Sequence, residues 1–182
     1  KEEGDYVYNS YMDAFSGLKN YFDKVKKEVL KKGVILINDF TKSKTFVDTY
    51  FKYKELDRQV NKESFWEKYK SDSEFKSDNK SLVRDWAITK SSIERMALNY
   101  PIQGTASDMT KLGVCLFTRK LKELNLFSPD KVKYVNIVHD EVDLESKTEY
   151  TEEIKTLLKN CLEEAGNKFC IIIPIKAEVG SS

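Results

Sequence analysis

The sequence of 182 residues predicts an α+β fold, in which helices pack against an antiparallel sheet. Three observations support this class. Apolar residues recur at intervals of three and four over residues 6–32, as they do on one face of an amphipathic helix. Residues that favour strands flank three polar residues at 139–141, which is typical of a β-hairpin. From residue 91 onward, the predicted order is helix, helix, hairpin, helix and strand.

The first half of the chain is predicted to begin with the helix over residues 6–32. Gly33 is expected to end it, because glycine readily adopts the left-handed conformation of a C-cap and two lysines precede it. Residues 33–40 then predict a short strand. Residues 41–53 are basic and aromatic, and we interpret them as an amphipathic helix face, with a DNA-contacting patch as the alternative.

Dense charge marks residues 54–82. Within this region, residues 71–80 are rich in serine, aspartate and lysine and are the most loop-like part of the chain. Neighbouring aromatic residues predict a small helix packed on the body of the protein, namely Phe65, Trp66 and Tyr69.

A helix is predicted to resume at about Ser81 and to run into Pro101. Proline lacks the backbone N–H and clashes with the preceding turn, so the helix is expected to break or kink there. A second helix follows, and one of its faces is predicted to carry Met109, Leu112, Leu116 and Leu121.

The last part of the chain is predicted to form a hairpin over residues 134–144, then a helix and a final strand. Thr151 is expected to cap the helix, and Gly166 is expected to end it. The strand is predicted at residues 170–179. The inner face of the helix is predicted to carry Ile154, Leu157, Leu158 and Cys161.

His139 is the only histidine in the chain, and Asp140 and Glu141 follow it between the two strand-like runs. This arrangement predicts a tight hairpin with an acid at its tip. A carboxylate held there is exposed and rigid, which suits the binding of a divalent cation. An ordinary polar turn is the alternative interpretation of these three residues taken alone.

A row of hydrogen-bond donors is the second candidate feature. Arg95, Asn99 and Gln103 are spaced four residues apart, so on a helix they share one face over about 12 Å. The minor groove of duplex DNA offers an acceptor at nearly the same place on every base pair. The row is therefore suited to checking the shape of base pairs without reading sequence. A solvated helix face followed by a loop is the alternative.

Composition limits the classes of protein to which the chain can belong. A hydrophobic content of 40% supports a packed core, and no apolar run approaches the length of a membrane span. The three cysteines form no C-x-x-C pair, which fits a reducing compartment better than a disulfide framework or a zinc site. The net charge of +1 argues against a free-standing nucleic-acid binder. Residues 19–32 are rich in lysine, whereas residues 140–164 are rich in aspartate and glutamate. This uneven charge suits a part of a larger DNA-binding protein better than a complete one.

Two motifs resemble the C-terminal part of the palm of family A DNA polymerases, the group of bacterial DNA polymerase I and the T7-like enzymes. Residues 95–108 match the family's R-x-x-x-N-x-P-x-Q-G-x-x-x-D stretch, and residues 138–141 match V-H-D-E at a palm hairpin, motif C. Residues 15–22 resemble the family's Y-P-G-[VL]-x-x-Y segment. Residues 173–180 resemble its terminal P-[LI]-x-x-[ED]-V-[GS] strand.

The resemblance implies an antiparallel palm sheet with packed helices, as the C-terminal fragment of a right-hand polymerase fold. It also implies template-directed transfer of dNMP to a primer 3′-hydroxyl. Asp140 is implied as the catalytic, metal-binding carboxylate and Glu141 as a supporting catalytic acid. The implied cofactors are two Mg²⁺ ions, for which motif A must supply the second carboxylate.

The implied partners are primer–template DNA, dNTP and the remaining polymerase segments, with no membrane. His139 is implied to face the primer terminus. The donor row is implied to bind the DNA minor groove and the strand backbone near that terminus. The expected location is the cytoplasm, in the nucleoid or in host cytoplasm for a phage protein, and an organellar origin stays open.

The family's motif A, D-[YF]-S-x-[IL]-E-x-R, and motif B, R-x-x-x-K-x-x-x-F-G-x-x-Y-G, are absent from the sequence. We therefore expect a C-terminal piece of a polymerase, inactive alone, whose thumb, motif A and motif B lie upstream or on another polypeptide. The first residue is not Met, and the polar start shows no signal peptide. Residues 1–90 would be fingers-derived helices with a lineage-specific insertion at residues 45–85. Residues 91–182 would be the C-terminal part of the palm with motif C.

Two other functions are alternatives. A non-catalytic DNA-binding or scaffold subunit with a palm-like fold agrees with the missing motifs, although binding alone requires no acid beside phosphates. A metal-dependent hydrolase using residues 139–141 is disfavoured, because adjacent residues of a strand point to opposite faces.

Overall fold

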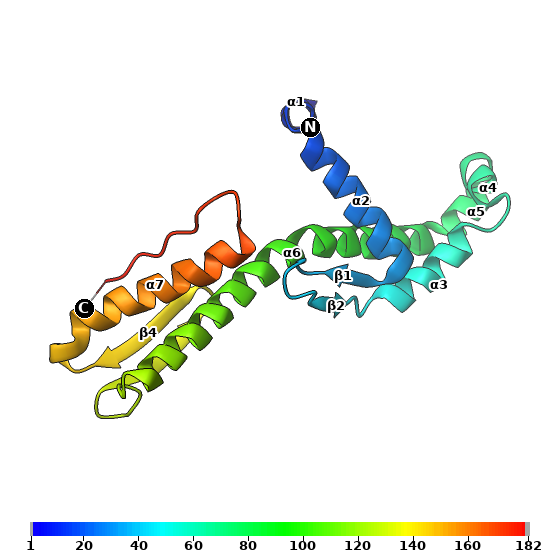
Figure 1. Ribbon diagram of the computed structural model, residues 1–182. Helices are drawn as coiled ribbons and strands as arrows, with labels where there is room; N and C mark the ends of the chain where they lie inside the picture. Colours follow the sequence, from blue (N-terminus) through cyan, green and yellow to red (C-terminus); the bar gives the residue numbers. More distant parts are fainter. Residues whose placement is uncertain (1, 181–182) are drawn as a thin grey trace. The chain divides into compact units, whose positions relative to one another are not determined.

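The computed structural model describes residues 2–180, apart from the side chains of residues 2, 3, 5, 8 and 11 (Figure 1). The chain forms two compact units. Unit 1 contains the residues up to Ile37 and Lys42–Pro101, and unit 2 contains Asn38–Thr41 and the residues from Ile102 onward. No helix within residues 2–180 combines the length and the apolar character needed to cross a membrane.

Unit 1 begins with two helices, α1 (Glu2–Ala14) and α2 (Ser16–Lys32), where one was predicted. The helix over residues 6–32 is interrupted at Phe15, whose φ of −118° and ψ of 61° are not helical. The predicted C-cap is confirmed: Gly33 has φ of +69° and donates its N–H to the carbonyl of Val29 at 2.8 Å. A Cβ at this position would also lie 2.5 Å from the ring of Tyr50, so only glycine fits.

A short β-hairpin follows, formed by β1 (Val34–Leu36) and β2 (Lys44–Phe46). The strands are antiparallel, and the register pairs Val34 with Phe46 and Leu36 with Lys44. β1 confirms the strand predicted at residues 33–40. The helix predicted for residues 41–53 is wrong over its first half, because residues 44–46 pair with β1 and the helix begins only at Tyr50.

Three short helices complete the middle of unit 1: α3 (Tyr50–Val60), α4 (Phe65–Ser71) and α5 (Ser73–Asp78). α4 is the predicted small helix. The loop predicted at residues 71–80 is wrong, because Asp72 caps α5 and accepts hydrogen bonds from the backbone N–H groups of Glu74 and Phe75 at 3.0 and 3.1 Å. Neighbouring rings hold the two short helices together, namely Phe65, Trp66, Tyr69 and Phe75.

Helix α6 (Lys80–Glu123) supplies residues to both units and contains Pro101. Of the break or kink predicted there, the break is wrong, since the helical conformation continues through the proline. A proline inside a helix costs about 3 kcal/mol. Burial on both sides of it offsets this cost: Ile93 and Ala97 lie in the core of unit 1, and Phe117 and Leu121 lie in the core of unit 2.

Unit 2 contains the hairpin of β3 (Val132–Val138) and β4 (Glu141–Ser146), a 3₁₀ turn η1 (Thr148–Tyr150) and helix α7 (Thr151–Phe169). The predicted hairpin is therefore confirmed. α6, α7 and one face of the hairpin enclose a single apolar core (Figure 1). Its buried members are Leu116, Phe117, Leu121, Leu126, Val132, Ile154, Leu158, Cys161 and Ala165.

The ends of α7 differ from the prediction. Thr151 is the first helical residue, not the cap, and its hydroxyl donates to the carbonyl of Lys147 at 3.4 Å. Gly166 does not end the helix, which continues to Phe169. Gly166 instead makes room for the returning chain, because a Cβ there would lie 2.6 Å from the Cβ of Ile175.

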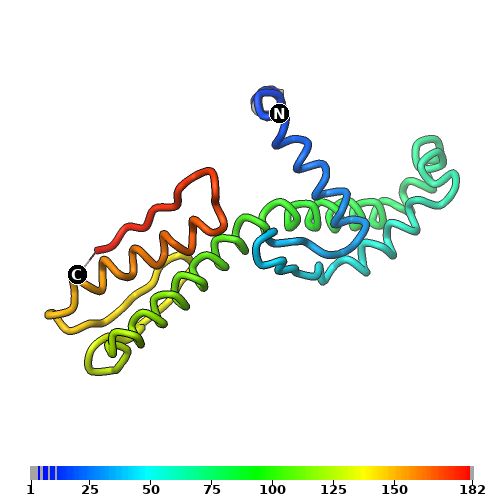
Figure 2. Tube along the Cα trace, in the orientation of Figure 1, coloured from blue at the N-terminus to red at the C-terminus, as the bar shows by residue number. Residues whose placement is uncertain are grey.

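The final strand predicted at residues 170–179 is wrong: within residues 170–180, no strand forms. The segment runs back along α7, as Figure 2 shows in red, and side chains of that helix hold it. Ile175 donates its N–H to Asn167 Oδ1 at 3.0 Å, and Ala177 donates its N–H to Glu163 Oε1 at 3.2 Å. Side chains of α7 thus accept hydrogen bonds that a neighbouring strand would accept in a sheet.

Replacing Gly166 by alanine is expected to lower the free energy of unfolding by about 1 kcal/mol. The clash with Ile175 costs about 1–3 kcal/mol and exceeds the gain in helix propensity of about 1 kcal/mol. Denaturant unfolding measures the change. Gly17→Ala in α2 is the matched control, because nothing lies within 4 Å of its added Cβ. Equal behaviour of the two variants would contradict the packing described for Ile175.

Candidate functional site

The tip of the β3–β4 hairpin is a two-residue turn of His139 and Asp140, since Val138 pairs with Glu141 across it. His139 has φ of +54°, in the left-handed region where histidine is found more often than most residues other than glycine. His139, Asp140 and Glu141 are all exposed. The structure therefore places the predicted carboxylate in the tight turn that the sequence predicted. Strained backbone of this kind is often found at functional sites.

Tyr134 anchors the inner face of the hairpin to α6. Its hydroxyl donates to the carbonyl of Val114 at 3.2 Å and lies 2.7 Å from the hydroxyl of Thr118. Burial raises the pKa of the Tyr134 phenol above its ordinary value of 10.0, which further favours the protonated form that donates this hydrogen bond. This half-buried contact ties β3 to α6.

A β-bulge lies between Tyr134 and the turn, where the register shifts by one residue between Tyr134 and Asn136. Bulges of this kind re-aim side chains next to functional sites. Val135 in the bulge is 62% exposed, and Ile137 and Val138 beyond it are 48% and 45% exposed. The outer face of β3 therefore carries exposed apolar side chains up to the turn.

The donor set fits part of a metal site. The carboxylate oxygens of Asp140 are the hard ligands that Mg²⁺ prefers, and they lie on an exposed two-residue turn. Among the side chains that the structure describes, however, no group of three or more from histidine, cysteine, aspartate or glutamate is arranged to hold a metal ion. Asp140 is thus a candidate for one ligand of a divalent cation.

The predicted donors lie on α6 with exposed side chains. Arg95 and Asn99 belong to unit 1 and are one helical turn apart, and Arg95 donates to Ser91 Oγ at 3.0 Å. Gln103 belongs to unit 2. Their exposure leaves these side chains accessible to a nucleic acid.

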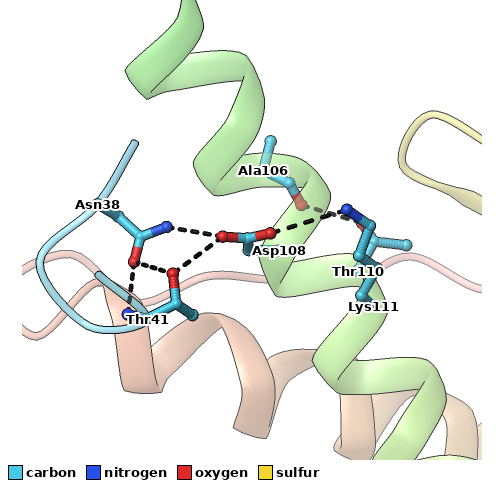
Figure 3. A network of polar contacts seen from close by, with 6 residues as sticks. All are labelled: Asn38, Thr41, Ala106, Asp108, Thr110 and Lys111. Atoms are coloured by element: carbon cyan, nitrogen blue, oxygen red, sulfur yellow. Dashed lines mark hydrogen bonds and ion pairs between the residues drawn. The ribbon is translucent and has the colours of Figure 1, made fainter. Parts of the chain in front are cut away.

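A polar network at Asp108 is the feature that the sequence analysis missed (Figure 3). Asn38 donates from Nδ2 to Asp108 Oδ2 at 2.8 Å, and the Thr41 hydroxyl lies 3.1 Å from the same oxygen. The ammonium of Lys111 lies 3.8 Å from Oδ1. One hint in the sequence pointed to this residue: Asp108 is the last residue of the motif at residues 95–108, and no role was assigned to it.

The α+β fold, with an antiparallel hairpin packed on helices, agrees with a fragment of a polymerase. The model of DNA polymerase family A matches residues 1–182, and the chain belongs to this family. DNA polymerase I of Caldicellulosiruptor bescii is 30% identical over 179 residues, which are 98% of this chain and 16% of the relative.

Two further proteins named DNA polymerase I are also similar to this chain. DNA polymerase I of Aquifex aeolicus is 39% identical over 82 residues, which are 45% of this chain and 14% of that protein. DNA polymerase I of Streptococcus pneumoniae serotype 4 is 29% identical over 165 residues, which are 91% of this chain and 14% of that protein. The chain thus spans 14–16% of the length of these relatives.

Proposed function

We propose that the chain is the C-terminal part of a DNA-directed DNA polymerase that transfers dNMP to a primer 3′-hydroxyl. The observation that carries this proposal is the exposed carboxylate of Asp140 in a tight hairpin turn of a family A chain. Residues 1–90 correspond in this proposal to fingers-derived helices with an insertion at residues 45–85, and residues 91–182 to the palm with motif C.

The chain's own residues have separate tasks in this proposal. Asp140 holds a divalent cation together with a carboxylate of motif A, and Glu141 supports it as the adjacent acid. Two Mg²⁺ ions, when bound, lower the pKa of the primer hydroxyl and stabilise the charge on the leaving pyrophosphate. His139 faces the primer terminus from the same turn.

DNA binding is assigned to the donors of α6. Arg95, Asn99 and Gln103 donate to acceptors in the minor groove and to the backbone near the primer terminus, which tests the shape of base pairs rather than their identity. Exposed lysines add attraction to phosphates that weakens with salt. The partners are thus primer–template DNA, dNTP and the remaining polymerase segments.

Reconstitution tests the proposed function. The 182-residue chain alone is expected not to extend a primer with Mg²⁺ and dNTPs, because its described residues hold no complete set of metal ligands. Addition of segments with the thumb, motif A and motif B is expected to give Mg²⁺-dependent extension. Extension by the chain alone would contradict the proposed incompleteness. Failure of the combined segments to extend would favour the alternative, a non-catalytic DNA-binding or scaffold subunit.

A further inference from the structure

Two phenylalanine side chains of unit 1 are largely exposed. Phe46 on β2 is 77% exposed and Phe51 on α3 is 83% exposed, and the apolar core of unit 1 contains neither ring. Both belong to the basic and aromatic run at residues 41–53, for which a DNA-contacting patch is the alternative prediction. Their exposure therefore marks a surface whose function the donor row and the hairpin turn do not explain.

The helices and strands of unit 1 each pack one face toward α6. Val29 of α2, Ile35 of β1 and Tyr53 of α3 are buried in one apolar cluster, to which α6 contributes Ile93 and Ala97. All five residues belong to unit 1. Side chains on the opposite face of each element therefore turn away from this cluster.

The two exposed rings and two lysines lie on these outer faces. Phe46 pairs with Val34, the neighbour of the buried isoleucine of β1, so both point to the outer face of the hairpin. Phe51 is two residues before the buried tyrosine of α3, which is about 200° around the helix. Lys27 and Lys31 lie two residues on either side of the buried valine of α2, also about 200° from it.

Contacts at Gly33 bring these groups to one corner of unit 1. The ring of Tyr50 would lie 2.5 Å from a Cβ at Gly33, and its hydroxyl donates to the carbonyl of Lys31 at 2.6 Å. The ring of Phe51 lies 5.9 Å from that of Tyr50. The residue after Gly33 is the strand partner of Phe46. The end of α2, the outer face of the hairpin and the start of α3 therefore meet here.

The lysines of this corner are available to an anion. Lys27, Lys31 and Lys54 are exposed, and no ion pair joins them to any residue that the structure describes. The acids adjacent to them in sequence, Glu28 and Glu55, pair with other cations. α2 as a whole carries six lysines and two acids. The exposed rings are thus surrounded by positive charge.

We propose that Phe46, Phe51 and the three lysines form a binding surface for single-stranded nucleic acid. Unpaired bases stack on aromatic rings, whereas the bases of a duplex are already stacked on one another, and ammonium groups attract the phosphates. A protein partner fits less well, because lysine is depleted in protein–protein interfaces. This inference rests on the proposed polymerase function for the identity of the strand, which is the unpaired template ahead of the primer.

Binding of fluorescein-labelled oligodeoxythymidylate to the 182-residue chain tests this proposal, with fluorescence anisotropy as the readout. Phe51→Ala is expected to weaken binding about tenfold, as for the loss of one stacked base, and Phe46→Ala should act in the same direction. Phe51→Trp keeps an aromatic face and should retain binding. Lys31→Ala is expected to lower the slope of log affinity against log salt by about 0.7.

Phe127→Ala is the matched control, because it removes a 43% exposed ring of unit 2 over which the ammonium of Lys122 already lies, 5.5 Å from the centroid. It should not weaken binding. Thermal unfolding verifies that the variants remain folded, which is expected for side chains this exposed. Binding of a blunt DNA duplex should not change in Phe51→Ala.

Primer extension by the wild-type reconstituted polymerase is measured in parallel, so that the two proposals can fail separately. No binding of the oligonucleotide by the wild-type chain, or equal binding by the wild type and Phe51→Ala, would overturn the surface even if extension occurs. Absence of extension, together with single-strand binding that depends on Phe51, would overturn the polymerase function and leave the surface supported.

Discussion

Primer extension by the reconstituted polymerase is expected to fall by about 10³-fold when Asp140 is replaced by alanine. This corresponds to about 4 kcal/mol of transition-state stabilisation at 1.36 kcal/mol per tenfold. The loss is expected because Asp140 is the acid at the tip of the β3–β4 turn and the proposed ligand of the catalytic cations. Single-turnover incorporation with saturating dNTP and Mg²⁺ measures it.

The affinity for primer–template DNA should not fall in the same variant, since removal of an acid does not weaken attraction to phosphates. Glu145→Gln is the matched control. It removes an acid from β4 of the same hairpin, but that acid pairs with Lys133 at 3.1 Å and lies away from the turn. The control is expected to extend primers like the wild type. Asp140→Ala activity within tenfold of wild type would show that the assignment of Asp140 is wrong.

The hairpin and its acid could be predicted because the information is local. Strand-forming residues stand on both sides of residues 139–141, and only a tight turn accommodates so short a polar run between them. Gly33 was predictable for the same reason, as glycine at the end of a periodic helical segment. In both cases the structure agrees with the pattern of a few neighbouring residues.

The errors arise where distant parts of the chain decide the structure. β2 is a strand because it pairs with β1, and its spacing of apolar residues also suits a helix. α6 continues through Pro101 because burial on either side outweighs the local preference for a break. The segment after α7 is extended, but acceptors on α7 replace the partner strand that its composition led us to expect.

The polar network at Asp108 could not be predicted from the sequence. Asn38 and Asp108 are 70 positions apart, and no periodicity or spacing connects an asparagine in a loop with an aspartate on a helix. The motif at residues 95–108 marked Asp108 only as its last member. Its contacts with Asn38 and Thr41 became visible only in the structure.

Replacing Phe117 by alanine is expected to lower the free energy of unfolding by about 3–5 kcal/mol, the largest effect on stability that we predict. Phe117 is fully buried in the core of unit 2, and its ring lies 6.2 Å from the ring of Tyr134 in an edge-to-face arrangement. The cavity left by the ring would lie under β3. Denaturant unfolding of the chain measures the loss.

Phe127→Ala is the matched control for this variant. Phe127 contacts the same ring of Tyr134, with centroids 6.3 Å apart, but it is 43% exposed. Its removal should cost only about 1 kcal/mol, because water already reaches much of the side chain. Since Tyr134 fixes β3, Phe117→Ala should also reduce extension by the reconstituted enzyme, whereas Phe127→Ala should not. Equal destabilisation by the two variants would contradict a core centred on Phe117. Unchanged extension by Phe117→Ala would show that packing in this core does not support the hairpin turn.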